Sequence, residues 1–262
     1  MLADRQPGVK LVDTHAHLDE IENIDEAIEE AKNAGVAAIV AVGQDRSSNS
    51  RVLELADQYD GFVFAALGLH PWTLGAMTEA ELDRTLDGIE ANIERAVAVG
   101  EIGLDYHKRV KEVSSKERQV EAFRLTLELA RKHSKPVSIH SRYSWKDAFD
   151  LTLASGVSQA VFHWYTGLAG VLREIIERGY CISATPAVEY HYEHRRAVRE
   201  CPLENLLLET DSPVRYGEQT KWEARPASIA RVLGPVAEIK CMEPARVAKV
   251  TTENAYRFFG LG

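Results

Sequence analysis

The chain has 262 residues, of which 45% are hydrophobic and 27% are charged, an ordinary composition for a folded globular protein. Its formal net charge of −9 argues against a protein that binds nucleic acid by phosphate neutralisation alone, so a polyanionic substrate would require local positive charge, such as a metal ion. No run approaches the ~18 apolar residues of a membrane-spanning helix, and the segment MLADRQPGVK lacks a signal-peptide pattern, so we expect a cytoplasmic protein without membrane contacts.

Apolar runs of strand length alternate with segments of helical period along the whole chain. The eight expected strands are Lys10–Asp13, Val36–Val42, Phe62–Leu67, Ala96–Glu101, Pro136–His140, Ala160–His163, Tyr180–Ser183 and Asn205–Glu209. The expected helices include Ile24–Ala34, Ser47–Tyr59, Glu79–Glu94, Lys116–His133 and Leu168–Arg178, with two more between Pro226 and Phe259.

Strands that alternate with helices pair in parallel through right-handed crossovers. Eight such units predict a TIM-like (β/α)8 barrel, in the α/β class, and no Pro-, Ser- or Gly-rich linker divides residues 1–262 into more than one domain. A doubly wound open sheet is the alternative, although no Gly-rich phosphate loop follows the first strand.

The three cysteines, Cys181, Cys201 and Cys241, lie in or beside apolar runs without a CxxC spacing. We therefore expect buried thiols, and neither a disulfide framework nor a zinc ribbon.

Histidines and acids gather at the carboxyl ends of the expected strands. They are His15, His17, His70, Glu101, His140, His163, Glu209 and Asp211. In an α/β barrel these strand ends open on one face, where the active site is built. We therefore expect one pocket that holds several imidazoles and at least two carboxylates.

The spacing of His15 and His17 suits a metal ion, because side chains at i and i+2 of an extended segment point to the same side. Taken alone, the pair could equally be solvated or part of the core. Neutral imidazole favours zinc, manganese, iron or nickel over the cations that prefer oxygen ligands.

Four histidines and two carboxylates exceed the protein ligands of a single catalytic zinc. We therefore expect two divalent cations, with zinc, manganese or magnesium as candidates. Glu101 is the expected bridge, because a carboxylate can give one oxygen to each ion; the alternative is a salt-bridged acid at the barrel rim. Asp211 is expected to bind a cation and act as general base, the alternative being a hydrogen bond to the Ser212–Pro213 turn.

Six ordered motifs, DTHAHLD, GLHPW, VGEIGLDYH, IHSR, HWYTG and LLLETDSPV, together with the later ENAYRFFG, resemble the TatD family of metal-dependent hydrolases, also called TatD-type deoxyribonucleases. The resemblance implies a TIM-like barrel of the amidohydrolase superfamily. It also implies the metal ligands His15, His17, Glu101, His140, His163 and Asp211, with the first histidine pair and Asp211 on one ion, the two later histidines on the other, and Glu101 joining them. We expect Glu101 and Asp211 to be the catalytic carboxylates. It implies roles near the ligands or the phosphate for His70 and Asp105, which could otherwise be capping or loop residues.

Several motifs depart from the family pattern. Trp164–Tyr165–Thr166–Gly167 stands where Cys-Phe-Ser-Gly is common, Tyr143–Ser144–Trp145 follows the fifth-strand motif, and Ser212–Pro213 replaces Ala-Pro. The expected ligands are retained, so these departures concern the substrate pocket.

The expected reaction is attack of a metal-activated water on a phosphodiester of DNA. Arg142, and also Lys108 or Arg109, are expected to contact phosphate. Bases could stack on Trp72, Trp164, Tyr165 and Tyr106, unless these rings only pack around the rim.

Three alternatives remain. The same barrel could hydrolyse a carboxylic ester or amide, such as an aminoacyl-tRNA ester or a lactone. It could be a catalytically silent metal-binding protein, or the polar residues could only satisfy backbone groups at the barrel end. No protein partner can be inferred from the sequence.

Overall fold

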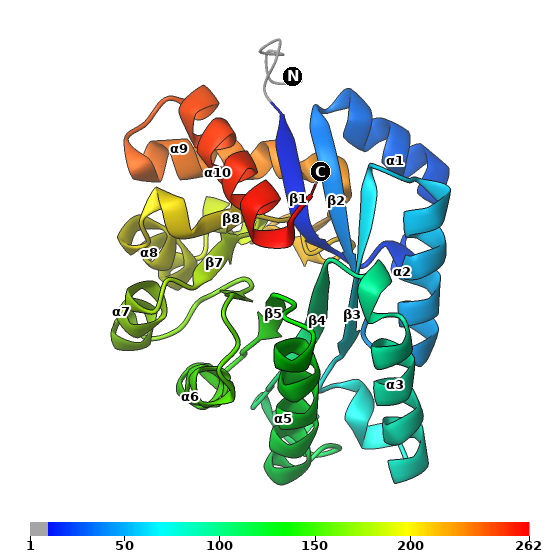
Figure 1. Ribbon diagram of the computed structural model, residues 1–262. Helices are drawn as coiled ribbons and strands as arrows, with labels where there is room; N and C mark the ends of the chain where they lie inside the picture. Colours follow the sequence, from blue (N-terminus) through cyan, green and yellow to red (C-terminus); the bar gives the residue numbers. More distant parts are fainter. Residues whose placement is uncertain (1–9, 262) are drawn as a thin grey trace.

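The computed structural model describes residues 10–261. The prediction that no signal peptide is present concerns residues 1–9, which lie outside the described residues. Eight parallel strands form one sheet in chain order from β1 to β8 (Figure 1). They are β1 (Leu11–Ala16), β2 (Val36–Val42), β3 (Val63–Leu69), β4 (Ala98–Gly103), β5 (Val137–His140), β6 (Ala160–Phe162), β7 (Cys181–Ala184) and β8 (Leu206–Leu208). The predicted (β/α)8 barrel is confirmed.

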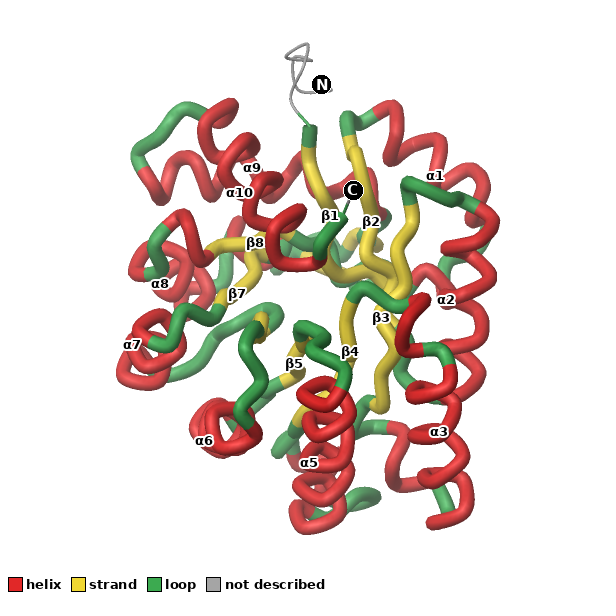
Figure 2. Tube along the Cα trace, viewed as in Figure 1, coloured by secondary structure: helices red, strands yellow, loops and turns green. Residues whose placement is uncertain are grey.

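The described chain has ten α-helices. The helices, red in Figure 2, lie around the outside of the strands. They are α1 (Ile24–Asn33), α2 (Arg46–Gln58), α3 (Glu79–Ala91), α4 (Lys108–Lys111), α5 (Lys116–Lys132), α6 (Trp145–Ser155), α7 (Ala169–Glu177), α8 (Tyr192–Glu200), α9 (Ile229–Lys240) and α10 (Pro244–Phe259). A short hairpin of β9 (Arg215–Tyr216) and β10 (Trp222–Glu223) follows β8. Within residues 10–261, no helix combines the length and apolar character needed to cross a membrane.

The strands are buried on both faces, as in other parallel sheets that helices cover. The fully apolar β2 therefore reads as a continuous run, VAAIVAV, rather than an alternating one. Helix starts are fixed locally: Asp45 before α2 and Thr78 before α3 each form a capping box with the residue three positions later.

The barrel closes between β1 and the segment after β8. The backbone N–H of Asp211 donates to the carbonyl of His15 at 2.9 Å, and the N–H of His17 donates to the carbonyl of Ser212 at 2.8 Å. Asp211 has a φ of 48°, a left-handed conformation that aspartate adopts more readily than most residues. Closure of the barrel and placement of three predicted site residues thus depend on the same few hydrogen bonds.

Several predicted boundaries were wrong. β1 continues to Ala16, so His15 lies inside the strand, because its polar residues are buried and hydrogen-bonded rather than solvated. β4 continues to Gly103, which places Glu101 within the strand instead of at its end. The expected helices did not include α4, α6 or α8, and the β9–β10 hairpin was also not predicted.

The cysteine prediction was correct for two residues and wrong for one. Cys181 and Cys201 are buried, whereas Cys241 is exposed. Cys241 directly follows α9 and has a φ of 52°, so the chain turns away from the helix at this residue. The hydropathy of the neighbouring residues did not reveal this turn.

His194 of α8 is a fully buried histidine, and it makes the stability of the fold depend on pH. Its Nδ1 lies 2.9 Å from the carbonyl oxygen of Tyr165, and its Nε2 accepts from the N–H of Thr185 at 3.1 Å. Burial lowers the pKa of His194 from 6.5 to about 4. Unfolding therefore takes up a proton between these pH values, and stability present above pH 6.5 is lost as the pH falls toward 4.

We expect His194 to contribute about 3 kcal/mol to the loss of unfolding free energy between pH 7 and pH 4. In His194→Gln this loss should be smaller by that amount, because glutamine keeps a donor and an acceptor but does not titrate. Urea unfolding at several pH values measures the difference. A variant whose pH dependence equals that of the wild type would contradict the assignment.

Candidate metal centre

The mouth of the barrel holds a pocket of about 920 Å³ at the carboxyl ends of the strands. The predicted site residues that line it are His17, His70, Glu101, His140, Arg142, His163 and Asp211. His15 lies against this group and is only 1% exposed. Side chains in or directly after β1, β3, β4, β5 and β6, and in the segment after β8, thus meet in one place.

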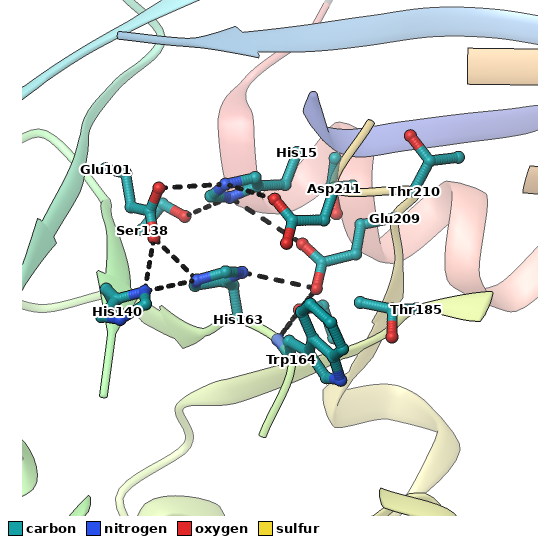
Figure 3. Close-up of polar contacts among 12 residues, drawn as sticks. His15, Glu101, Ser138, His140, His163, Trp164, Thr185, Glu209, Thr210 and Asp211 are labelled. Carbon is teal, nitrogen blue, oxygen red and sulfur yellow. Dashed lines mark hydrogen bonds and ion pairs between the residues drawn. The ribbon is translucent and has the colours of Figure 1, made fainter. Parts of the chain in front are cut away.

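The two carboxylate oxygens of Glu101 face different pairs of histidines. Oε2 lies 3.4 Å from Nε2 of His15 and 3.5 Å from Nε2 of His17. Oε1 lies 2.8 Å from Nδ1 of His140 and 2.8 Å from Nε2 of His163. Figure 3 shows Glu101 joined by dashed lines to His15, His140 and His163. A carboxylate placed in this way can serve two cations, one through each oxygen.

Asp211 completes the group around the first histidine pair. Its Oδ1 lies 3.6 Å from Nε2 of His15 and 3.3 Å from Nε2 of His17. The ligand atoms of His15, His17 and Asp211 all lie within 4.8 Å of one another. The i, i+2 spacing on β1 therefore places both imidazoles against the same carboxylates.

The outward nitrogens of three of these histidines have polar neighbours that fix the rings. Nδ1 of His15 lies 3.2 Å from the hydroxyl of Ser138, and Nδ1 of His17 lies 2.9 Å from the amide of Gln44. Nε2 of His140 lies 3.0 Å from Oδ2 of Asp105. Contacts of this kind orient metal-ligating imidazoles in proteins.

Two features of these residues fit a divalent cation: the chemistry of their ligand atoms, and the presence of buried polar atoms without hydrogen-bond partners. Within residues 10–261, Nε2 of His15, Nδ1 of His163 and Oε2 of Glu209 are buried without a hydrogen-bond partner. Buried polar atoms without partners are rare in folded proteins, and they cluster at sites that bind an ion or water. Imidazole nitrogens with carboxylate oxygens are ligands that zinc and manganese accept.

The carboxylates of the centre raise the pKa values of two neighbouring imidazoles. Burial alone would lower the pKa of His163, but the charges of Glu101 and Glu209 outweigh burial and raise it well above 6.5. Burial also opposes charge on His17, yet hydrogen bonding to Asp211 and the charge of Glu101 raise its pKa to about 9. The buried carboxylates therefore need positive charge beside them, which protons or divalent cations can supply.

His70 lies on the Glu101 side of the pocket. Its Nδ1 accepts from the backbone N–H of Trp72 at 3.2 Å, and its Nε2 lies 3.4 Å from Oε1 of Glu101. Burial lowers the pKa of His70 to about 4, so the ring stays neutral. Because Nδ1 accepts, the proton of the neutral ring sits on Nε2, which faces the centre as a donor.

Glu209 is a functional candidate that was not among the predicted ligands, although it ends the eighth expected strand. It is fully buried, with Oε1 2.8 Å from the hydroxyl of Ser183 and 2.8 Å from the N–H of Trp164. Oε2 lies 3.8 Å from Nδ1 of His15 (Figure 3). The spacing of Glu209 and Asp211, two residues apart as in the histidine pair, was the signal for it.

The expected substrate contacts separate into two groups. Arg142 and Trp72 line the pocket and both contact the buried Asp105. Lys108 and Arg109 are exposed on α4, outside the lining residues.

Two of the aromatic residues suggested for base stacking have structural contacts instead. Tyr165 is fully buried, with its hydroxyl donating to the carbonyl of Leu168, so base stacking on it was wrong. Tyr106 donates to Asp147 and packs against the core. Trp164 does line the pocket, with its ring 5.3 Å from that of Tyr216.

Known proteins resemble the chain along nearly its whole length. The family model described as TatD related DNase matches residues 12–260. The chain belongs to the TatD family. It is 32% identical to deoxyribonuclease TATDN3 of Homo sapiens over 97% of this chain and 96% of that protein. It is 35% identical to the uncharacterized metal-dependent hydrolase YabD of Bacillus subtilis over 95% of this chain and 98% of that one.

A solved TatD homologue has the same fold. The crystal structure of YjjV from Escherichia coli superposes with a TM-score of 0.86 and 29% identity, covering 96% of this chain and 98% of that chain. The eight-stranded barrel of this TatD-family chain is therefore shared along nearly its whole length.

Asp105 offers a test of how this TatD-family site holds cations. We expect Asp105→Asn to weaken divalent cation binding by about 10–100-fold, because an amide oxygen orients the ring of His140 less strongly than a carboxylate does. Calorimetric titration of the metal-free protein with zinc or manganese measures the change. Asp147→Asn, at a carboxylate of α6 that accepts from Tyr106, is the matched control. Equal affinities for Asp105→Asn and the control would contradict the expectation.

Proposed function

We propose that the protein is a metal-dependent hydrolase that cleaves phosphodiester bonds of DNA at a centre of two divalent cations. The observation that carries the proposal is Glu101, whose two oxygens face His15 and His17 on one side and His140 and His163 on the other. The names of related family members, which include a deoxyribonuclease and a metal-dependent hydrolase, support the reaction class and the substrate.

The proposed ligands fall into two sets joined by Glu101. One cation would be held by His15, His17 and Asp211, and the other by His140 and His163. Zinc or manganese suits this imidazole-rich set better than magnesium, which prefers oxygen ligands and keeps several waters. Bound cations would supply Lewis acidity, which polarises a phosphoryl oxygen and makes water more acidic.

The protein's own residues would position the reactants and move the proton. Asp211 lines the pocket and is 5% exposed, so its carboxylate can accept a proton from a water held at the barrel mouth. Nε2–H of His70 faces the pocket and can donate to a phosphate oxygen or to Glu101. The burial of Glu101 and His163 keeps bulk water from competing for these contacts.

We propose nucleic acid as the partner, with DNA as the substrate. We also propose that the protein acts in the cytoplasm, as expected from the sequence. The net charge of −9 would repel a polyanion at long range. Within the pocket, however, Arg142 and Arg215 are among the lining residues, and two divalent cations would add four positive charges.

A substrate panel tests the proposal. The purified protein, loaded with manganese or zinc, is given single-stranded DNA, RNA, bis(4-nitrophenyl) phosphate and a carboxylic ester, and initial rates are compared. We expect metal-dependent cleavage of DNA and of the simple phosphodiester, and no cleavage after chelation.

The other outcomes contradict the proposal in distinct ways. Turnover of the carboxylic ester alone would identify an ester hydrolase in the same barrel. Cation binding without turnover of any substrate would identify a catalytically silent metal-binding protein.

A further inference from the structure

One wall of the pocket carries a tryptophan and an arginine that share a single buried carboxylate. Trp72, Asp105 and Arg142 follow β3, β4 and β5, which are neighbours in the barrel. The indole N–H of Trp72 donates to Oδ2 of Asp105 at 2.6 Å. Arg142 binds the same carboxylate through Nη2 at 2.9 Å and Nε at 3.2 Å.

The exposure of the three side chains differs sharply. Asp105 is fully buried, whereas Trp72 is 51% exposed and the side chain of Arg142 is 39% exposed. The guanidinium carbon of Arg142 lies 5.2 Å from the centre of the Trp72 ring. A half-exposed tryptophan leaves a large apolar surface in water, and such surfaces mark places where a ligand binds.

Asp105 fixes both groups before any ligand arrives. It also accepts from the N–H of His107 at 2.7 Å and faces Nε2 of His140 at 3.0 Å. Four groups of the protein, from Trp72, His107, His140 and Arg142, thus share this one buried carboxylate. Because Asp105 uses Nε and Nη2 of Arg142, the Nη1 edge of the guanidinium remains for a ligand.

The position of this wall relative to the metal centre sets what it can bind. Nδ1 of His140 faces Glu101, while Nε2 of the same ring lies 3.0 Å from Oδ2 of Asp105, the oxygen that Nη2 of Arg142 also contacts at 2.9 Å. The ion pairs and hydrogen bonds of the Arg142 side chain thus go to Asp105 and not to Glu101 or a proposed ligand, within the described contacts. Its place beside the ligands, rather than among them, suits a phosphate next to the one that reacts.

We propose that Trp72 and Arg142 form a nucleotide subsite next to the scissile phosphate. The base of the neighbouring nucleotide stacks on the indole of Trp72, and the phosphate of that nucleotide binds the Nη1 edge of Arg142. Asp105 is the positioning residue for both. Stacking on aromatic rings tolerates any base, and an arginine fork suits phosphate. The inference rests on the proposed function, which it deepens by naming the residues that bind the nucleotide next to the cleaved bond.

A double-mutant cycle between protein and substrate tests the stacking. Single-stranded hexanucleotides carry one abasic residue at each position in turn, and the cleaved bond is mapped for each. With intact DNA, Trp72→Leu is expected to raise KM and lower kcat/KM by about 10–100-fold, with kcat little changed. With the abasic residue next to the cleaved bond, Trp72→Leu should have little further effect.

Two further variants test the other contacts. Trp72→Phe separates stacking from support of Asp105, and Arg142→Gln tests the phosphate contact. Trp72→Phe keeps a ring but loses the indole N–H, so it should retain most of the wild-type kcat/KM. Arg142→Gln should raise KM for intact DNA but not for DNA with a neutral methylphosphonate at the neighbouring linkage. Tyr256→Leu, at an exposed aromatic residue of α10 outside the pocket lining, should behave as wild type throughout.

Each opposite result is informative. Equal losses for Trp72→Leu and Trp72→Phe, on intact and abasic DNA alike, would show that Trp72 only holds Asp105 and would overturn the subsite alone. A wild-type protein that cleaves no oligonucleotide would overturn the proposed function and the subsite with it.

Discussion

Asp211→Asn is expected to lower metal-dependent turnover by about 10²–10⁴-fold, the range typical for loss of a positioned proton acceptor. Asparagine has the same shape as aspartate, and the N–H of residue 211 would still donate to His15, so the fold should be retained. The lost charge is what faces His15 and His17 at 3.6 Å and 3.3 Å. Initial rates at saturating substrate, with manganese or zinc added, measure the effect.

The control for this prediction is Asp150→Asn, at an exposed carboxylate of α6 that pairs with Lys146. It should leave turnover unchanged. If Asp211→Asn retained wild-type turnover with circular dichroism unchanged, Asp211 would be no more than a structural acceptor beside the Ser212–Pro213 turn.

Glu101→Gln should have the largest effect on metal binding. Its carboxylate is the one group within 3.5 Å of His15, His17, His140 and His163, as the described contacts show. Glutamine removes the charge and one of the two acceptor oxygens, so we expect fewer than two cations per chain. The stoichiometry is measured by calorimetry and by metal analysis after gel filtration.

Thermal unfolding gives a second readout for Glu101→Gln. A cation at 1,000 times its Kd adds about 4 kcal/mol to the unfolding free energy of the wild type, and each kcal/mol corresponds to about 2–4 °C in Tm for a chain near this size. The wild type should therefore lose roughly 10 °C on chelation, and Glu101→Gln much less. A variant that still binds two cations, with the full chelation-dependent shift, would contradict the bridging role.

The convergence of His15, His17 and Asp211 could be predicted from the sequence because the barrel imposes it. His15 and His17 sit two residues apart on an extended segment, and Asp211 follows a fully apolar strand. In a parallel barrel the carboxyl ends of the strands converge, so residues distant in the chain meet without any further information. Local periodicity and topology together were sufficient for this part.

The contacts among loop side chains could not be predicted in the same way. That Trp72, His140 and Arg142 all contact Asp105 depends on loop conformations after three different strands, which periodicity does not encode. Tyr165 is likewise fully buried, with its hydroxyl donating to the carbonyl of Leu168. These features belong to tertiary packing, which overrides local pattern.

A crystal of the protein grown with manganese, examined by anomalous scattering at the barrel mouth, tests the two-cation centre directly. We predict two peaks, one beside His15, His17 and Asp211 and one beside His140 and His163, with Glu101 between them. No peak at the barrel mouth, or density bound elsewhere on the protein, would contradict it.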